Sequence, residues 1–287
     1  MLSVPVILAI IVFLAWGFGD VVNLSFSRQA GARQAAFLSW LGGLVMVSLG
    51  LFGAPAWPDA GVVAASAALG LLLGWCWIGF EKALEIGKGS VVCTIAGAFV
   101  AVTLVLSMVF LGESLTAPQI AAVVVAVLGV ILVSADPAEF RGGFKLDRSV
   151  ALALAVMLGW GVFYTFVKLP IAAAGWYWPT LIVEVVGFLP VLWFARKEIR
   201  GAFSRRTNLK LALGTGFLVG GGTLIYDIAL QAGGSAMTAA IAGSFPALTV
   251  VVIAIVFKEK LRRVQVLGVV LTLIAIVALA AGLFSLA

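Results

Sequence analysis

Four carboxylic acids inside long apolar stretches are the clearest chemical signal in this sequence. Asp20, Glu81, Glu184 and Asp227 lie there although only 10% of the residues are charged and 63% are hydrophobic. An ionisable group inside a lipid bilayer is unfavourable, so such groups are usually retained for function. A carboxyl group that takes up a proton or cation on one side of a membrane and releases it on the other would couple solute movement to an ion gradient.

Each of these acids also has a structural interpretation. Glu81 and Asp227 lie about one helical turn from the end of their apolar stretches, so a solvated helix end explains them equally well. For Glu184, a pair with Lys168 or with a tyrosine hydroxyl competes with a functional role. With these alternatives open, we expect Glu81, Asp227, Glu184 and Lys168 to serve in coupling or gating.

Aromatic and polar residues at helical spacing indicate a binding cavity. Residues three or four positions apart share one helix face, and two such faces are Trp16, Asp20 and Asn23, and then Trp160, Tyr164 and Lys168. A second matched pair of faces is Trp77, Glu81 and Glu85, and then Thr223, Asp227 and Gln231, with Phe80 matched by Tyr226. We expect the first pair of faces to line the cavity, and we assign to the substrate site Trp16, Asp20, Asn23, Trp77, Phe80, Trp160, Tyr164 and Tyr226. With Trp75 as a further indole, the aromatic residues predict a solute with an apolar or aromatic part and a polar head. The alternative is that the tryptophans only pack or anchor the chain at the interface.

The run Gly243-Ser244-Phe245-Pro246 predicts a helix interrupted near its middle. Proline removes a backbone donor and loosens the preceding turn, which frees carbonyl groups for a ligand. We therefore place Ser244 in the substrate site and Pro246 in the gating set, with a simple packing kink as the alternative. The equivalent segment of the first half is Gly97-Ala98-Phe99.

The composition requires a membrane to surround these residues. A mean hydropathy of +1.22 is incompatible with an ordinary soluble protein, in which about 25% of residues are charged. The net charge of +6 comes from bases in short loops, so we expect no nucleic-acid partner. With two buried-type cysteines, Cys76 and Cys93, and no histidine, we expect no disulfide framework, no metal site and no cofactor.

Ten apolar runs are each long enough for a membrane-spanning helix. They cover residues 3–24, 34–52, 61–84, 90–111, 118–134, 150–169, 179–194, 209–230, 235–257 and 264–283. The polar segment 136–149 divides them into five and five. We therefore predict an all-α polytopic membrane protein with a first repeat at 1–135, a linker at 136–149 and a second repeat at 150–287.

An internal repeat supports this division. Shifting residues 80–119 by 146 positions places them on 226–265 with 13 identities in 40 positions, among them Glu113 on Glu259. Because each copy has an odd number of spans, the second copy must enter the membrane from the opposite side, so the repeats are inverted. All 18 Lys and Arg residues except Lys168 fall in alternate loops, which predicts that those loops are cytoplasmic and that both termini are not.

The chain resembles the ten-helix EamA-type branch of the drug/metabolite transporter superfamily. The resemblance rests on Trp16-Gly17 and Trp160-Gly161, on the Ala-Leu pairs at 83–84 and 229–230, on the block from Gly87 through the Phe-Leu-Gly-Glu-Ser-Leu run at 110–115 to Gln119, and on its repeat from Phe245-Pro246 to Gln265. It implies secondary transport of small organic solutes, commonly export of amino acids, through a central cavity. The usual proline of the fourth helix is Val100 here, so we expect the two halves to bend differently.

These observations predict an inner-membrane secondary transporter, not an enzyme, that moves small amphipathic metabolites by alternating access. We expect spans 1, 3, 4, 6, 8 and 9 to line the cavity, and we expect proton or cation coupling and a monomer or homodimer in the lipid bilayer. The alternative is a membrane-embedded enzyme or sensor for a lipophilic ligand. Such enzymes usually carry clustered acids or His and Cys at metal spacing, and this sequence has neither.

Overall fold

The computed structural model describes residues 3–48, 55–87, 89–134, 147–203, 206–232, 235–256 and 262–280. Within these ranges the chain is helical apart from short turns and contains no strand. The helices of the first half are α1 Val4–Ala30, α2 Ala32–Ser48, α3 Ala60–Ile86, α4 Gly89–Gly97, α5 Phe99–Phe110 and α6 Ala117–Ser134. Those of the second half are α8 Arg148–Phe166, α9 Lys168–Ala174, α10 Tyr177–Ala195, α11 Ile199–Ala202, α12 Arg206–Thr215, the π-helix η2 Gly216–Gly220, α13 Gly221–Ala232, α14 Ser235–Ala242, α15 Phe245–Val256 and α16 Arg263–Ala280.

Each of the ten predicted spans is helical over most of its described residues, with short turns inside the fourth, sixth and ninth. Seven helical segments are long and apolar enough to cross a membrane, and two shorter apolar segments, Ala117–Leu132 and Arg263–Ala278, fall on α6 and α16. The prediction of an all-α polytopic membrane protein is confirmed. Most of the segment expected as a linker, and Glu259 with its neighbouring bases, lie outside the described residues.

Local sequence signals explain where several helices begin and end. The Asp59 carboxylate accepts a hydrogen bond from Val62 N (3.0 Å) at the start of α3, and Asp147 accepts one from Val150 N (2.9 Å) at the start of α8. Those hydrogen bonds from Val150 and from Ser149 hold the pKa of Asp147 below its ordinary value. Gly31 and Gly175 end the matched helices α1 and α9 with φ angles of 82° and 77°, which side chains disfavour.

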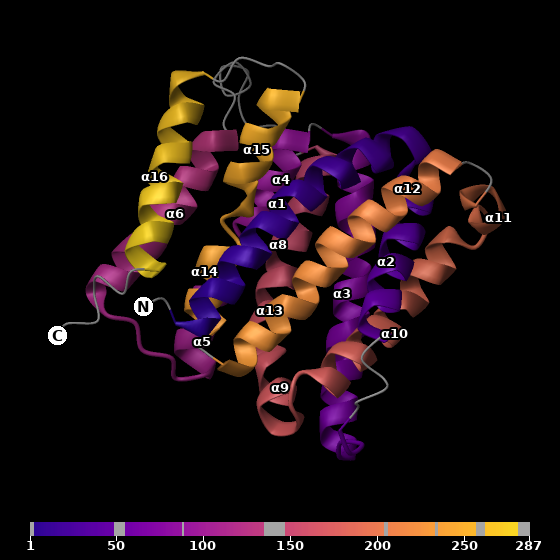
Figure 1. Cartoon of the computed structure of the whole chain (residues 1–287), viewed down its shortest axis with the longest axis horizontal. Coiled ribbons are helices and arrows are strands. Elements are labelled where there is room, and N and C mark those ends of the chain that lie inside the picture. Colours follow the sequence, from indigo (N-terminus) through magenta and orange to yellow (C-terminus); the bar gives the residue numbers. More distant parts are fainter. Residues whose placement is uncertain are drawn as a thin grey trace.

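The two halves pack with the same helix pairings. Helix α3 packs against α8 as α13 packs against α1, and α5 packs against α8 as α15 packs against α1. Two contacts join counterparts directly, α2 with α10 and α6 with α16, and the last pair forms one edge of the molecule (Figure 1). Exchanging the halves therefore reproduces the packing, as expected for a duplicated unit.

The halves run in opposite directions through the molecule. Arg148 at the start of α8 lines the same cavity as Gly31 at the end of α1, so the first helix of each half points the opposite way. Helix α1 begins and α16 ends at one end of the bundle (Figure 1). This is the arrangement of an inverted repeat, in which substrate sites lie at the contact between the halves.

Glycines allow the closest helix contacts across the halves. A Cβ atom on Gly74 of α3 would lie 2.2 Å from the Gly187 carbonyl oxygen of α10. One on Gly220 of η2 would lie 2.4 Å from Gly43 Cα of α2, in the matched contact. Glycine at these positions lets the helix backbones touch, which is the role that small residues have between membrane helices.

Both halves contain an interrupted helix at matched residues. Ala98 N donates to Ile95 O (3.2 Å) between α4 and α5, and Ser244 N donates to Ile241 O (3.3 Å) between α14 and α15. In both places the N–H group donates to the carbonyl three residues earlier, and not to the one four residues earlier as in a regular α-helix. The predicted interruption before Pro246 is confirmed, and the first half is interrupted at the matched residues without a proline of its own. The first interruption packs against Pro246 of the other half.

Candidate functional site

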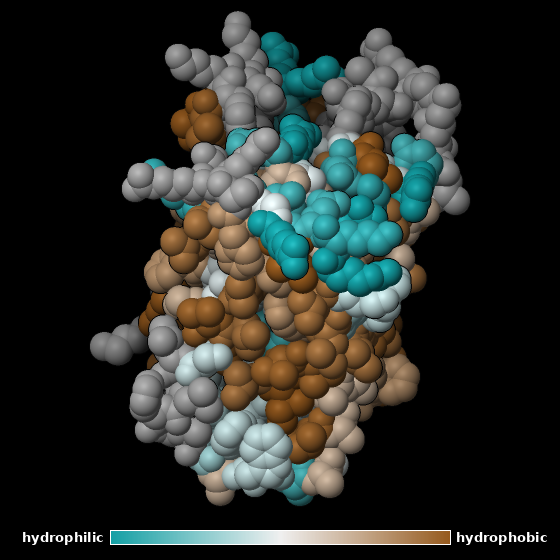
Figure 2. All heavy atoms as spheres, turned by 90° about the vertical axis from the view of Figure 1, so that its right-hand side faces the viewer, coloured by the Kyte–Doolittle hydropathy of each residue, from teal (hydrophilic) through white to brown (hydrophobic). Residues whose placement is uncertain are grey.

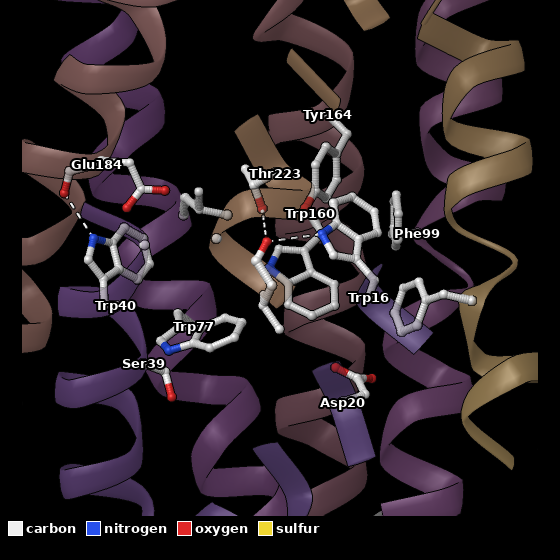
Figure 3. Close-up of a pocket in the computed structure, with 15 residues that line it drawn as sticks. Trp16, Asp20, Ser39, Trp40, Trp77, Phe99, Trp160, Tyr164, Glu184 and Thr223 are labelled. Atoms are coloured by element: carbon white, nitrogen blue, oxygen red, sulfur yellow. Dashed lines mark hydrogen bonds between the residues drawn. The ribbon is translucent and has the colours of Figure 1, made fainter. Parts of the chain in front are cut away.

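A cavity of about 60 Å³ lies where the two halves meet (Figure 3). Side chains from both halves surround it: Trp16, Asp20, Ser39, Trp40, Gly43, Leu73, Trp77 and Phe99 from the first, and Trp160, Tyr164, Glu184, Val219, Gly220, Thr223 and Phe245 from the second. Six of the predicted site residues, Trp16, Asp20, Trp77, Trp160, Tyr164 and Glu184, are therefore brought together. Seven of these fifteen residues are aromatic.

The aromatic wall repeats the symmetry of the fold. The Trp16 ring lies 5.7 Å from Phe245 at 82°, and the matched Trp160 ring lies 5.9 Å from Phe99 at 89°. Tyr226 and Phe80 stand behind these indoles without lining the cavity, with Tyr226 5.5 Å from Trp16 and Phe80 4.9 Å from Trp160. Rings at these separations contribute stabilisation beyond their buried area, so the wall is well ordered.

Two of the four cavity indoles are held by backbone carbonyl groups and two are not. Trp16 Nε1 donates to Val219 O (3.3 Å) and Trp40 Nε1 donates to Glu184 O (2.9 Å). The Nε1 atoms of Trp77 and Trp160 are buried and have no hydrogen-bond partner among the described residues. Buried donors are nearly always satisfied in folded proteins, so these two N–H groups are candidates for binding a solute.

Two carboxyl groups face the cavity, and no lysine or arginine of the described part of the chain lines it. Asp20 and Glu184 are only 7% and 6% exposed, and Figure 3 shows them on different sides of the indole cluster. Asp20 Oδ2 has no hydrogen-bond partner among the described residues. The lining therefore combines acceptor groups with aromatic faces, which both attract a positively charged group.

A polar layer lies directly behind the cavity in the first half. Asn23 is fully buried there and accepts a hydrogen bond from the Ser39 hydroxyl (3.3 Å), so it does not line the cavity as predicted for the substrate site. Glu81 is also fully buried, and Asn23 and Ser27 lie beside it. Neither oxygen of the Glu81 carboxyl group has a hydrogen-bond partner within the described part of the chain.

The corresponding acid of the second half has a partner. Asp227 is 1% exposed, and its Oδ2 accepts a hydrogen bond from the Thr180 hydroxyl (2.6 Å). The side chains of Glu81 and Asp227 are themselves buried, so the solvated-end interpretation does not apply to them. The two acids are buried behind the cavity wall.

Ser244 and Pro246 lie at the interruption between α14 and α15, away from the central cavity. The Ser244 hydroxyl donates to Ala240 O (2.7 Å), and Ser244 borders a separate space of about 10 Å³. Thr249 donates to Gly17 O (3.2 Å), and its counterpart Thr103 donates to Gly161 O (3.4 Å). These matched hydrogen bonds fix the interrupted helices to the helices that carry Trp16 and Trp160.

Lys168 lies at the far end of the second half, where Nζ pairs with Glu113 Oε1 at 2.6 Å. The two side chains are 27% and 13% exposed. This pair links the first-half loop after α5 to α9, and it corrects the expected partner of Glu184, which is not Lys168.

Predicted spans 2 and 7 also contribute to the cavity, and neither was among the six spans expected to line it, although Glu184 of span 7 was a candidate for coupling or gating. Helix α2 lies close to the centre because glycines allow it to pack tightly against η2. It therefore contributes Ser39, Trp40 and Gly43 to the lining. The only available signal was an indole beside a hydroxyl within one apolar run. Trp75, by contrast, points away from the cavity and is 53% exposed, with its ring 6.0 Å from Trp193.

An inverted pair of helical halves that encloses a polar and aromatic cavity inside a membrane defines a transporter. The model of the EamA-like transporter family matches the chain twice, over residues 3–135 and 147–281. The chain belongs to the EamA-like transporter family and is a membrane transporter of the drug/metabolite type. Because the members of this family are transporters, the family assignment agrees with the prediction that the chain is not an enzyme.

The fold is shared with a known structure. A solved structure titled "Crystal structure of protein" aligns with 99% of this chain and 100% of its own, with a TM-score of 0.74 and 16% sequence identity. At this identity the similarity supports the fold alone. A search of curated proteins finds no match.

Proposed function

We propose that this transporter exports small amphipathic metabolites, amino acids or related solutes, across the inner membrane by alternating access between its two halves. The observation that carries the proposal is the cavity between the halves, with four indoles, two carboxyl groups and no base in its lining. The halves are the repeats at 1–135 and 150–287, and both termini lie on the non-cytoplasmic side. The working unit is a monomer or a homodimer.

The lining is complementary to an amine with an apolar part. An ammonium group fits Asp20 and Glu184 and also gains from the faces of Trp16 and Tyr164. The unpartnered N–H groups of Trp77 and Trp160 supply donors for an acceptor group such as a carboxylate. The combination favours an amino acid or a related amine over an anion, because an anion would meet two carboxyl groups without a base.

The small volume of the cavity supports a conformation in which the two halves are closed around it. Sites for small organic ligands are roughly 300–1,000 Å³, whereas this cavity is about 60 Å³. A solute therefore enters only when the halves separate. The interruptions at Ala98 and Ser244 are the points at which α4 can move relative to α5 and α14 relative to α15.

Proton coupling is the form of energy supply that fits the buried acids. Glu81 and Asp227 are fully or almost fully buried behind the cavity, and neither forms an ion pair with a base of the described residues. A buried carboxylate without a base is strongly disfavoured relative to its protonated form. Movement of the halves that exposes these groups to one side and then the other would load and release protons.

Transport by purified protein in proteoliposomes tests the proposal. Radiolabelled amino acids and related amines are offered with and without an imposed pH gradient, and empty liposomes serve as the control. We expect saturable uptake of at least one amine, and a rate that changes with the gradient. If nothing in a broad metabolite panel moves or binds, the proposed function is wrong.

A further inference from the structure

A second cavity, of about 460 Å³, lies where the ends of several spans meet. It is bordered by Gly31 at the end of α1, Arg33 at the start of α2, Lys82 and Glu85 at the end of α3, and Arg148 at the start of α8. Phe194 and Glu198, around the end of α10, complete it. Because spans end at the membrane surface, the cavity lies at the level of lipid headgroups.

The charges of this cavity are opposite to those of the central one. Three bases and two acids line it, and both acids are already engaged. Arg33 Nη1 pairs with Glu198 Oε1 at 2.9 Å, and Lys82 pairs with Glu85. Arg148, which is exposed, has no ion-pair partner among the described residues. The cavity therefore has one uncompensated positive charge next to two further bases.

Aromatic side chains lie beside these bases on the outer surface of α3 and α10. Trp75 is 53% exposed and Trp193 is 56% exposed, and their rings are 6.0 Å apart. The Arg196 guanidinium lies 4.5 Å from the Trp193 ring, and that of Arg33 lies 5.5 Å from the Phe194 ring. Exposed indoles next to bases are typical of the boundary between lipid tails and headgroups.

The outer surface of the molecule is likewise divided into a hydrophilic end and a hydrophobic band. Figure 2 shows the side that carries α11 and α12, where hydrophilic residues gather toward one end above a broad hydrophobic band. A lipid whose tails cover such a band holds its headgroup at the level of the hydrophilic end. Basic cavities between membrane helices are suited to the phosphate groups of anionic lipids.

We propose that this cavity binds the phosphate group of an anionic phospholipid between Arg148, Lys82 and Arg33, with the acyl chains lying along Trp75 and Trp193. The cavity has room for a headgroup and is formed by both halves, since Arg33 and Lys82 belong to the first and Arg148 to the second. The bound lipid therefore bridges the halves at one end of α3 and stabilises their contact there. This site is separate from the solute cavity.

Native mass spectrometry from nanodiscs tests the site. Wild-type protein is released from nanodiscs that contain equal amounts of phosphatidylglycerol and phosphatidylcholine. We expect retention of one phosphatidylglycerol in preference to phosphatidylcholine. In Arg148→Gln we expect binding about fivefold weaker, because one base near an anionic lipid contributes about a factor of that size. Lys210→Gln, which removes an exposed base of α12 outside the cavity, serves as the matched control and should retain the lipid as the wild type does.

Thermal unfolding supplies an independent measurement. Phosphatidylglycerol should raise the unfolding temperature of the wild type and of Lys210→Gln more than that of Arg148→Gln. Equal retention of the two lipids by the wild type, or unchanged retention by Arg148→Gln, would overturn the proposal. Inorganic phosphate that gives the same stabilisation in pure phosphatidylcholine nanodiscs would identify the ligand as a free anion and would equally overturn it.

Discussion

Gly97 and Pro246 touch where the interrupted helices of the two halves cross: a Cβ atom on Gly97 would lie 2.7 Å from Pro246 Cγ. The matched pair does the same, since a Cβ atom on Gly243 would lie 2.2 Å from Val100 Cγ2. Each interruption is thus packed against the residue that follows the interruption in the other half. The two interruptions form one joint between the halves, and Pro246 takes part in one of its two contacts.

Adding a methyl group to this joint should destabilise the protein. Gly97→Ala and Gly243→Ala force atoms apart in a packed contact, for which we expect a loss of about 1–3 kcal/mol in the free energy of unfolding. The matched control is Gly221→Ala, where no atom lies within 4 Å of the added Cβ. Unfolding in mixed detergent micelles gives the comparison, and equal stability of Gly97→Ala and Gly221→Ala would contradict the prediction.

Removing the charge of the cavity acids should abolish solute binding without unfolding the protein. Asp20→Asn and Glu184→Gln keep the shape of each side chain and remove the group that attracts an amine. We expect at least a tenfold fall in the rate of uptake into proteoliposomes, with a nearly unchanged unfolding temperature.

Asp59→Asn is the control for the acid substitutions, because asparagine caps a helix as well as aspartate does and Asp59 lies at the exposed start of α3. Wild-type transport by both cavity variants would mean that the ammonium group of the solute binds elsewhere.

Removing the indole N–H group should affect stability at Trp40 and solute binding at Trp160. Trp40→Phe removes the hydrogen bond that the indole donates to the Glu184 carbonyl oxygen, and we expect about 0.5–1.5 kcal/mol lower stability. Trp160→Phe removes an N–H group that has no described partner, so we expect unchanged stability and weaker solute binding. Unfolding and substrate-induced thermal shift, measured on both variants, distinguish the two effects; the reverse pattern would count against a solute-binding role for Trp160.

Glu81→Gln should uncouple transport from protons. Glutamine resembles the protonated acid, so a fully buried site without a described base should accept it with little change in stability. We expect uptake that persists while its dependence on an imposed pH gradient is lost. Glu85→Gln, on the same helix but 32% exposed at the side chain, is the control and should keep the gradient dependence. A gradient response that survives in Glu81→Gln would remove this residue from the coupling pathway.

The sequence alone determined the class of fold. Ten apolar runs, an odd number in each copy and bases confined to alternate loops indicated an inverted helical repeat, because a bilayer allows few other solutions. The faces containing Trp16, Asp20, Trp160 and Tyr164 were also accessible, since helical spacing fixes which residues share a face.

Only the tertiary structure decided which of these faces enclose the cavity and which lie behind it. Trp75 and Trp77 are two positions apart on one helix, yet one faces outward and the other lines the cavity. Likewise, Val100 gave no sign that the fourth span is interrupted, because the proline that packs against this interruption belongs to the other half. A local sequence pattern predicts the secondary structure of its own segment. The joint between the two copies depends instead on contacts between residues about 150 positions apart in the chain, which no local pattern contains.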